Sequence, residues 1–133
     1  MARDTLLAAG GKRMKPAPSS GQHWIVEFYG ARELNDVKTI RRVLKNAAVL
    51  SGATLLKIQL HHFGAGGGVT GVALLAESHI SIHTWPERAY AAIDIFMCGS
   101  KCSPHAALES LRSELRPKRA KIRRLVRRMP RSK

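Results

Sequence analysis

The chain has 133 residues, a formal net charge of +14 and a hydrophobic fraction of 44%. The length suits one domain with its own core, and the apolar fraction argues against disorder throughout. Because no apolar run approaches the ~20 residues of a membrane span and two cysteines cannot form a disulfide framework, we expect a cytoplasmic protein without a transmembrane segment.

The N-terminal part predicts a leader, a strand and a helix. Residues 1–22 are rich in Gly, Pro, Ser, Lys and Ala, which is typical of a flexible basic leader, and they lack the apolar region of a signal peptide. The aromatic and β-branched residues of HWIVEFYG, 23–30, predict a strand. Residues 34–52 predict a helix, because the apolar residues fall on one face, with Asn35 or Asp36 as its N-cap.

The middle of the chain predicts four strands. The alternation in TLLKIQLHHF indicates a half-buried strand, and three apolar or β-branched runs follow it. The four segments are residues 54–63, 69–76, 79–85 and 90–99. The glycine-rich GAGGG, residues 64–68, is a loop between the first two.

The C-terminal part predicts a second helix and a basic end. SPHAALESLRSELR, residues 103–116, begins with Ser103 as N-cap and a proline in the first turn. Residues 120–126 predict a last strand, and residues 127–133 a basic tail.

The positive charge is concentrated at this end of the chain. Between Arg116 and Lys133 there are ten Lys or Arg residues and no acid. Such a run is either a solvated end or a contact for nucleic acid or another anionic surface. It holds no aromatic residue, so stacking on bases has no support there.

The order of elements predicts the fold class. It is β-α-β-β followed by β-β-α-β, which is not the simple alternation of a Rossmann-like parallel sheet. We expect an α+β fold: a two-layer sandwich with a mostly antiparallel sheet, helices on one face and two β-α-β-β-like halves, formed by one domain over residues 23–126.

The stretch AESHISIHTWPE carries more reactive side chains than a turn between strands needs. His79 and His83 are four residues apart, which on a strand is about 13 Å, too far to share one zinc ion. Cys98 and Cys102 have no second cysteine pair. We therefore expect no metal site.

A serine hydrolase site is also poorly supported. Ser78 lies between Glu77 and His79, but the glycines of a nucleophile elbow are missing. From periodicity alone, Ser78 is a turn residue and His83 a hydrogen-bonded strand histidine.

ESHISIHTWPE, followed by YAAIDIFMCG, closely resembles the bacterial and archaeal type of S-adenosylmethionine decarboxylase. The resemblance extends from HWIVEFYG to about Val126, and the blocks occur together at the expected spacing. It implies an inactive proenzyme that cuts itself between residues 77 and 78. The Ser78 hydroxyl attacks the Glu77 carbonyl, the resulting ester is eliminated, and residue 78 becomes a pyruvoyl group that begins the second chain.

The resemblance also implies the role of each site residue. The pyruvoyl group from Ser78 forms a Schiff base with the substrate amine and takes up the electrons left by carbon dioxide. His83 corresponds to the acid or base of self-processing, and Cys98 to the proton donor for the decarboxylated carbon. Phe63 corresponds to an aromatic residue against the adenine or the sulfonium, and Glu87 to an acid that binds ribose hydroxyls.

Three positions depart from the family pattern. Thr70 stands in GVTG where the family commonly has Ser, and it keeps the hydroxyl that could assist processing. The GAGGG loop is one residue longer than expected, and Ala89 stands where the family often has Gly. The loop glycines allow Phe63 more freedom.

The leading hypothesis is thus decarboxylation of S-adenosylmethionine to the aminopropyl donor for spermidine synthesis. The family resemblance implies a homodimer with sites near the subunit interface. One alternative is a pyruvoyl decarboxylase of arginine or ornithine with the same fold. Another is a non-catalytic RNA-binding domain that uses the basic tail.

Overall fold

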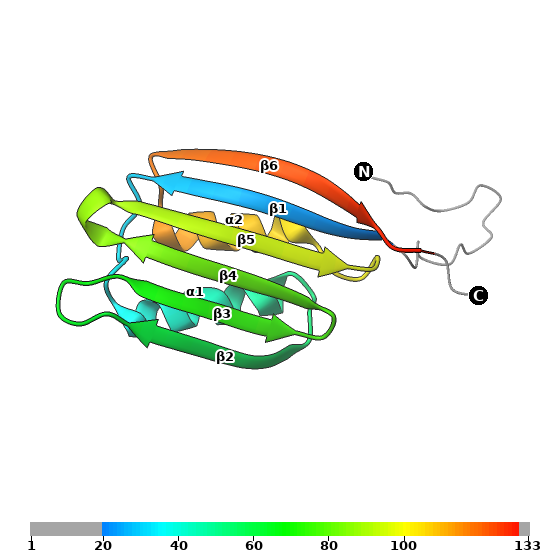
Figure 1. Ribbon diagram of the computed structural model, residues 1–133, viewed down its shortest axis with the longest axis horizontal. Coiled ribbons are helices and arrows are strands. Elements are labelled where there is room, and N and C mark those ends of the chain that lie inside the picture. The colour runs from blue at the N-terminus through cyan, green and yellow to red at the C-terminus, as the bar shows by residue number, and fades with distance from the viewer. Residues whose placement is uncertain (1–19, 131–133) are drawn as a thin grey trace.

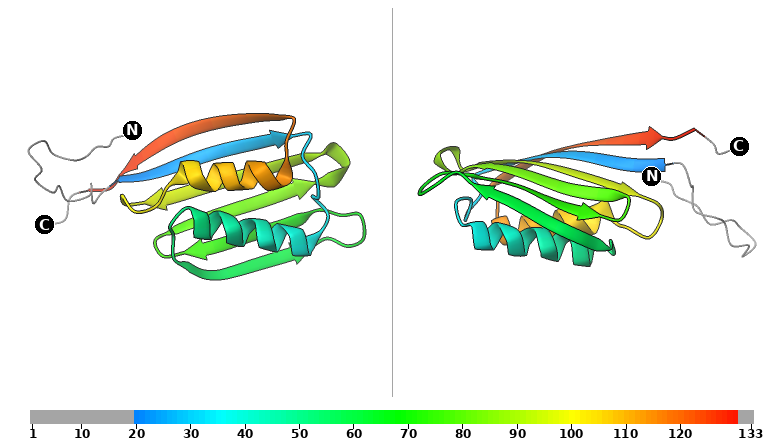
Figure 2. Two further views of the ribbon diagram at one scale, coloured as in Figure 1. Left: turned by 180° about the vertical axis from the view of Figure 1, so that it is seen from behind. Right: turned by 60° about the horizontal axis from the view of Figure 1, so that its bottom comes forward.

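Six strands form one sheet with two helices on one face (Figures 1 and 2) in the computed structural model, which describes residues 20–130. In chain order the elements are β1 (Ser20–Tyr29), α1 (Val37–Leu50), β2 (Leu55–His62), β3 (Val69–Leu75), β4 (Ser78–Trp85), the short 3-10 helix η2 (Pro86–Arg88), β5 (Tyr90–Cys98), α2 (Pro104–Leu115) and β6 (Arg119–Arg128). The predicted α+β class and the predicted order of strands and helices are confirmed.

The strand order in the sheet is β2-β3-β4-β5-β1-β6, and all five neighbouring pairs are antiparallel. The two halves of the chain therefore interleave, because β1 from the first half lies between β5 and β6 from the second. β1 and β6 come from the two ends of the described chain. They lie side by side, with β6 at one edge of the sheet (Figure 1).

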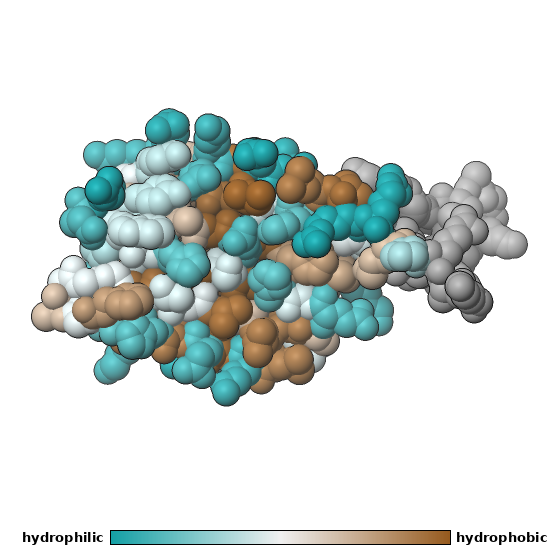
Figure 3. Space-filling model, in the orientation of Figure 1, coloured by the Kyte–Doolittle hydropathy of each residue, from teal (hydrophilic) through white to brown (hydrophobic). Residues whose placement is uncertain are grey.

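The two faces of the sheet differ. One face packs on α1 and α2, and alternate side chains such as Val26, Phe28, Ile80 and Ile82 are fully buried against it. Within residues 20–130, the opposite face, called here the open face, carries no helix (Figure 2). In the space-filling view of this side, apolar residues lie among charged and polar ones (Figure 3).

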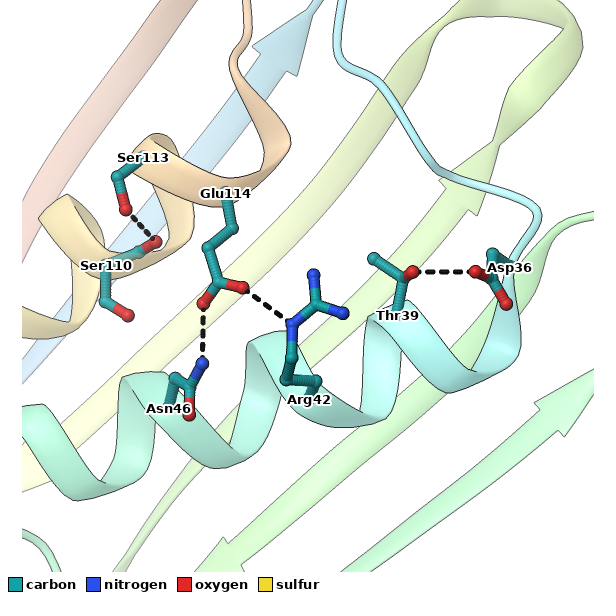
Figure 4. Close-up of polar contacts among 7 residues, drawn as sticks. All are labelled: Asp36, Thr39, Arg42, Asn46, Ser110, Ser113 and Glu114. Carbon is teal, nitrogen blue, oxygen red and sulfur yellow. Dashed lines mark hydrogen bonds and ion pairs between the residues drawn. The ribbon is translucent and has the colours of Figure 1, made fainter.

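A capping residue stabilises the start of α1, and one group of polar contacts joins α1 to α2 (Figure 4). Asp36 caps α1 by accepting hydrogen bonds from the Lys38 backbone N–H at 3.2 Å and the Thr39 hydroxyl at 2.7 Å. On α2, the Glu114 carboxylate accepts hydrogen bonds from two side chains of α1. These donors are Arg42 Nε at 3.0 Å and Asn46 Nδ2 at 2.9 Å.

Within residues 20–130 no helix has the length and apolar character that a membrane span requires.

Two strands extend into the segments that the sequence assigned to the leader and the tail. β1 begins at Ser20, inside the segment assigned to the leader, and β6 continues to Arg128, inside the segment assigned to the tail. Ser20 pairs with Arg128, so each strand satisfies backbone groups of the other. Residues 1–19 and 131–133, which complete the expected leader and tail, lie outside the described residues.

The turn between β4 and β5 contains a strained alanine. Ala89 ends η2 with φ 49° and ψ 38°, in the left-handed region where a Cβ is unfavourable. Its backbone is fixed on both sides: its N–H donates to Pro86 O at 3.0 Å, and its carbonyl accepts from the Ala31 N–H at 2.9 Å. The chain therefore holds a non-glycine residue in a conformation that suits glycine.

We predict that Ala89→Gly raises the free energy of unfolding by about 0.5 to 1 kcal/mol, because it removes this backbone strain. Urea unfolding followed by circular dichroism measures the change. The matched control is Ala106→Gly within α2, which should lower the free energy of unfolding by about 1 kcal/mol. Destabilisation by both substitutions would contradict the assignment of strain to Ala89.

Candidate active site

A two-residue turn joins β3 to β4 at the centre of the predicted site. Leu75 pairs with Ser78, so only Ala76 and Glu77 lie between the strands. Glu77 has φ 62°, a left-handed conformation that is uncommon for a residue with a side chain. The peptide bond between residues 77 and 78 thus follows a strained residue at the end of a tight hairpin.

Ser78 is nearly buried, with 8% of its surface exposed, and lies against the end of β5. Its Oγ accepts a hydrogen bond of 3.2 Å from the backbone N–H of Cys98. Burial raises the pKa of the Cys98 thiol, and the nearby Glu77 carboxylate raises it further. The raised pKa favours the protonated thiol. We call Glu77, Ser78 and Cys98 the cleavage cluster.

A second group of predicted residues lies around a pocket of about 380 Å³ at the other end of β4. Thr70 on β3 is paired with His83 on β4, and Thr70 Oγ1 lies 3.1 Å from His83 Nδ1, within hydrogen-bonding distance. Phe63, Trp85 and Glu87 line the same pocket. We call these five residues the pocket cluster.

The floor of the pocket depends on a close approach between backbones. At Gly68, an added Cβ would collide with the carbonyl oxygen of Thr84, so only glycine allows this approach. The buried Thr84 hydroxyl accepts from the Val69 N–H at 2.8 Å and donates to the Leu34 carbonyl at 2.7 Å. The glycine-rich loop is therefore anchored at the end that enters β3.

Trp85 is held by a row of stacked side chains that crosses the open face. The centroids of Trp85 and Tyr90 are 5.4 Å apart and those of Tyr90 and Tyr29 are 5.5 Å apart, at interplanar angles of 31° and 30°. The Arg119 guanidinium lies 4.1 Å from the centroid of Tyr29. Tyr90 also donates a hydrogen bond to Glu27, which raises the pKa of Tyr90 to about 12 and keeps the phenol protonated.

The structure does not bring the two clusters together within one chain. Ser78 begins β4 and His83 lies five residues further along it, a distance of about 17 Å. Cys98 is beside Ser78, whereas Thr70 is beside His83. The predicted processing residue His83 thus does not contact the Glu77–Ser78 peptide bond of its own chain.

The sequence analysis predicts no role for several residues that line the pocket. Trp85 lies within the motif that identifies the family, and its spacing of two residues from His83 on a strand indicates that both side chains lie on the same face of the sheet. Gly67, Gly68 and Thr84 have no comparable local signal, because their importance comes from a contact across the β3–β4 hairpin. In the part of the chain that the structure describes, no three His, Cys, Asp or Glu side chains gather as metal ligands would.

The known proteins that this chain resembles, described below, belong to one family. The sequence model of a family described as S-adenosylmethionine decarboxylase matches residues 22–128. The S-adenosylmethionine decarboxylase proenzyme of Prochlorococcus marinus is 47% identical over 112 residues, covering 83% of this chain and 89% of the relative. That of Thermomicrobium roseum is 40% identical over 104 residues, covering 78% and 90%. The crystal structure of the adenosylmethionine decarboxylase from Aquifex aeolicus matches with a TM-score of 0.78 at 32% identity, covering 88% of this chain and 98% of that one.

We predict that Tyr90→Ala releases the Trp85 indole, because Tyr90 stacks on it and is itself fixed by Glu27. In a Trp24→Phe background, Trp85 emission should shift to the red and its quenching by acrylamide should rise about twofold or more. Tyr90→Phe keeps the ring and is the matched control. Equal spectra for the two variants would show that the stack does not position Trp85.

Proposed function

Because the chain belongs to the S-adenosylmethionine decarboxylase family, we propose that it removes the carboxyl group of S-adenosylmethionine as carbon dioxide, with Ser78 as the precursor of a pyruvoyl group. The observation that carries this proposal is the position of Ser78. It follows the strained Glu77 directly and accepts a hydrogen bond from the backbone of Cys98. The product is the aminopropyl donor for spermidine synthesis.

Self-cleavage begins with the Ser78 hydroxyl. Its oxygen attacks the carbonyl carbon of Glu77, and the peptide bond becomes an ester. Loss of the Ser78 α-proton then breaks the ester bond and releases the Glu77 carboxylate, which leaves dehydroalanine at residue 78. Tautomerisation and hydrolysis release ammonia and leave the pyruvoyl group. Relief of the left-handed Glu77 conformation favours the first step.

The side chains of both clusters have distinct roles in decarboxylation. When present, the pyruvoyl group accepts the electrons that carbon dioxide leaves behind. The Cys98 thiol, kept protonated by its burial and by Glu77, donates a proton to the decarboxylated carbon. In the pocket cluster, Phe63 and Trp85 bind the adenine or the sulfonium, and Glu87 accepts hydrogen bonds from the ribose.

A complete site requires residues from two copies of the chain. The cleavage cluster and the pocket cluster lie about 17 Å apart along β4, too far to act on one small substrate. The two clusters come together in a homodimer in which the open faces of the two sheets face each other and the two-fold axis runs across the strands. The end of the sheet that carries the cleavage cluster, with Cys98 on the open face and Ser78 beside it at the end of β4, then lies over the pocket cluster of the partner. Leu74 on β3 and Trp85 on β4 lie on open-face positions and are 45% and 39% exposed, which suits a surface around β3 and β4 that a second copy covers.

Arginine and ornithine remain alternative substrates for pyruvoyl chemistry. The aromatic pair Phe63 and Trp85, together with Glu87, favours a nucleoside over a simple amino acid, because neither arginine nor ornithine carries a ring or a ribose. Carbon dioxide release from each of the three substrates separates these activities.

We predict that the purified chain consists of fragments 1–77 and 78–133, and that the second lacks an N-terminal amine. Ser78→Ala should remain one chain and lose decarboxylation by a factor of about 10³ or more, since it cannot form the electron sink. Intact mass and release of labelled carbon dioxide measure both effects. Ser81→Ala, on the same strand, is the matched control and should be cut normally. An uncut chain with full activity would disprove the proposal.

We predict that Ser78→Ala and His83→Asn restore each other when they are co-expressed, although each is inactive alone. Half of a random mixture of dimers is mixed, and one of the two sites in each mixed dimer is intact. About a quarter of wild-type activity should therefore return. Co-expression of Ser78→Ala with Cys98→Ala is the control and should restore nothing, because these residues share a cluster. Activity in neither mixture would refute the shared site.

A further inference from the structure

The basic C-terminal segment is mainly an ordered strand. β6 is the outermost strand of the sheet and pairs with β1 alone, so the backbone groups along its other edge have no partner strand within residues 20–130. From Arg116 to Arg128 the chain has eight Lys or Arg residues and no acid. Six of the eight lie on β6, and all six are exposed.

These charges are not neutralised within the described part of the chain. Elsewhere Arg42 pairs with Glu114 at 3.0 Å, but no carboxylate of residues 20–130 lies within 4.0 Å of a basic group on β6. Closely spaced positive charges repel each other and destabilise the folded state. The decarboxylase reaction proposed above uses none of them.

The charges lie on both faces of the strand. The register with β1 places Lys121 and Arg123 on the open face, beside Glu27 and Ile25. Arg124 lies on the opposite face, where its guanidinium is 4.5 Å from the centroid of Trp24. A flat bilayer would meet only one of these faces. A flexible phosphodiester chain, or a duplex groove with phosphates on both sides, can contact both.

Three of the arginines are held in place by aromatic rings. Arg119, Arg124 and Arg127 lie over Tyr29, Trp24 and Phe96 at 4.1, 4.5 and 5.4 Å from the ring centroids. Stacking of this kind fixes the plane of a guanidinium and leaves its N–H edges free for bidentate hydrogen bonds to phosphate. The side-chain entropy that phosphate binding would otherwise cost is thereby reduced.

We propose that β6 is a nucleic-acid-binding edge, which contacts the phosphodiester backbone without sequence preference. The ten residues of the strand span about 33 Å, enough for a continuous row of phosphates. The contacts are to phosphate, because the residues are Arg and Lys on an edge and β6 itself has no aromatic ring to stack on bases. β6 contributes no residue to either cluster of the decarboxylase site, and the test of this surface does not depend on cleavage or turnover.

The test is fluorescence anisotropy of the full chain with a labelled 20-nucleotide uridine RNA and a 20-base-pair DNA duplex, over a range of salt concentrations. The triple variant Lys121→Gln, Arg123→Gln, Arg128→Gln removes three charges that are not stacked on rings. For RNA, the slope of log K against log salt should fall in magnitude by about 2, and binding at low salt should weaken about tenfold or more. The duplex arm shows whether β6 prefers single or double strands.

The matched control removes three exposed charges from α1: Lys38→Gln, Arg41→Gln, Lys45→Gln. A second variant, Lys121→Arg, Arg123→Lys, Arg128→Lys, keeps the charge and should keep binding. Equal weakening by the α1 variant would overturn the proposal, because net charge and not β6 would then be responsible. Binding to anionic phosphatidylserine vesicles without binding to RNA or DNA would also overturn it, in favour of a membrane surface.

Discussion

The antiparallel register of β3, β4 and β5, fixed at the Ala76–Glu77 turn, determines most of the chemistry of this chain. It puts Thr70 opposite His83 and brings the backbone of Cys98 to Ser78. A slip of one residue in this hairpin would turn every side chain of β4 to the other face. The buried residues Ile80 and Ile82 prevent the slip, since they would become exposed. Core packing on one face of β4 therefore fixes the position of the reactive groups.

The two faces of this sheet have mostly different roles, although Ser78 shares the helix-facing positions of β4 with Ile80 and Ile82. The two helices pack on one side of the sheet, cover its backbone there and enclose one hydrophobic core. The open face carries the Thr70–His83 pair, the stacked aromatic row and the end of β5 with Cys98. Because both faces share one rigid backbone, groups at opposite ends of β4 cannot approach each other within a chain. The proposed two-fold dimer would place them around one substrate.

The position of β6 at an edge explains how the fold tolerates its charge. A central strand with six basic residues would bury some of them, at a high desolvation cost. On an edge strand the charged groups remain in water, and the long Arg side chains cover the rings of Trp24, Tyr29 and Phe96. Charged side chains on an edge also discourage pairing with strands of other molecules.

The sequence by itself determined both α-helices and all six strands to within a few residues, because periodicity and capping act locally, but it did not predict the short 3-10 helix η2. Asp36 and Ser103 cap the α-helices, in agreement with the sequence. The motif around Ser78 identified the family, since reactive residues at fixed spacing identify a chemistry. Only the tertiary structure decided that β1 lies between β5 and β6, that Trp85 is stacked on Tyr90 and that the predicted site residues form two separate clusters. These features depend on which distant strands pair and in what register. The choice is made by burial of the whole core, which no local pattern records.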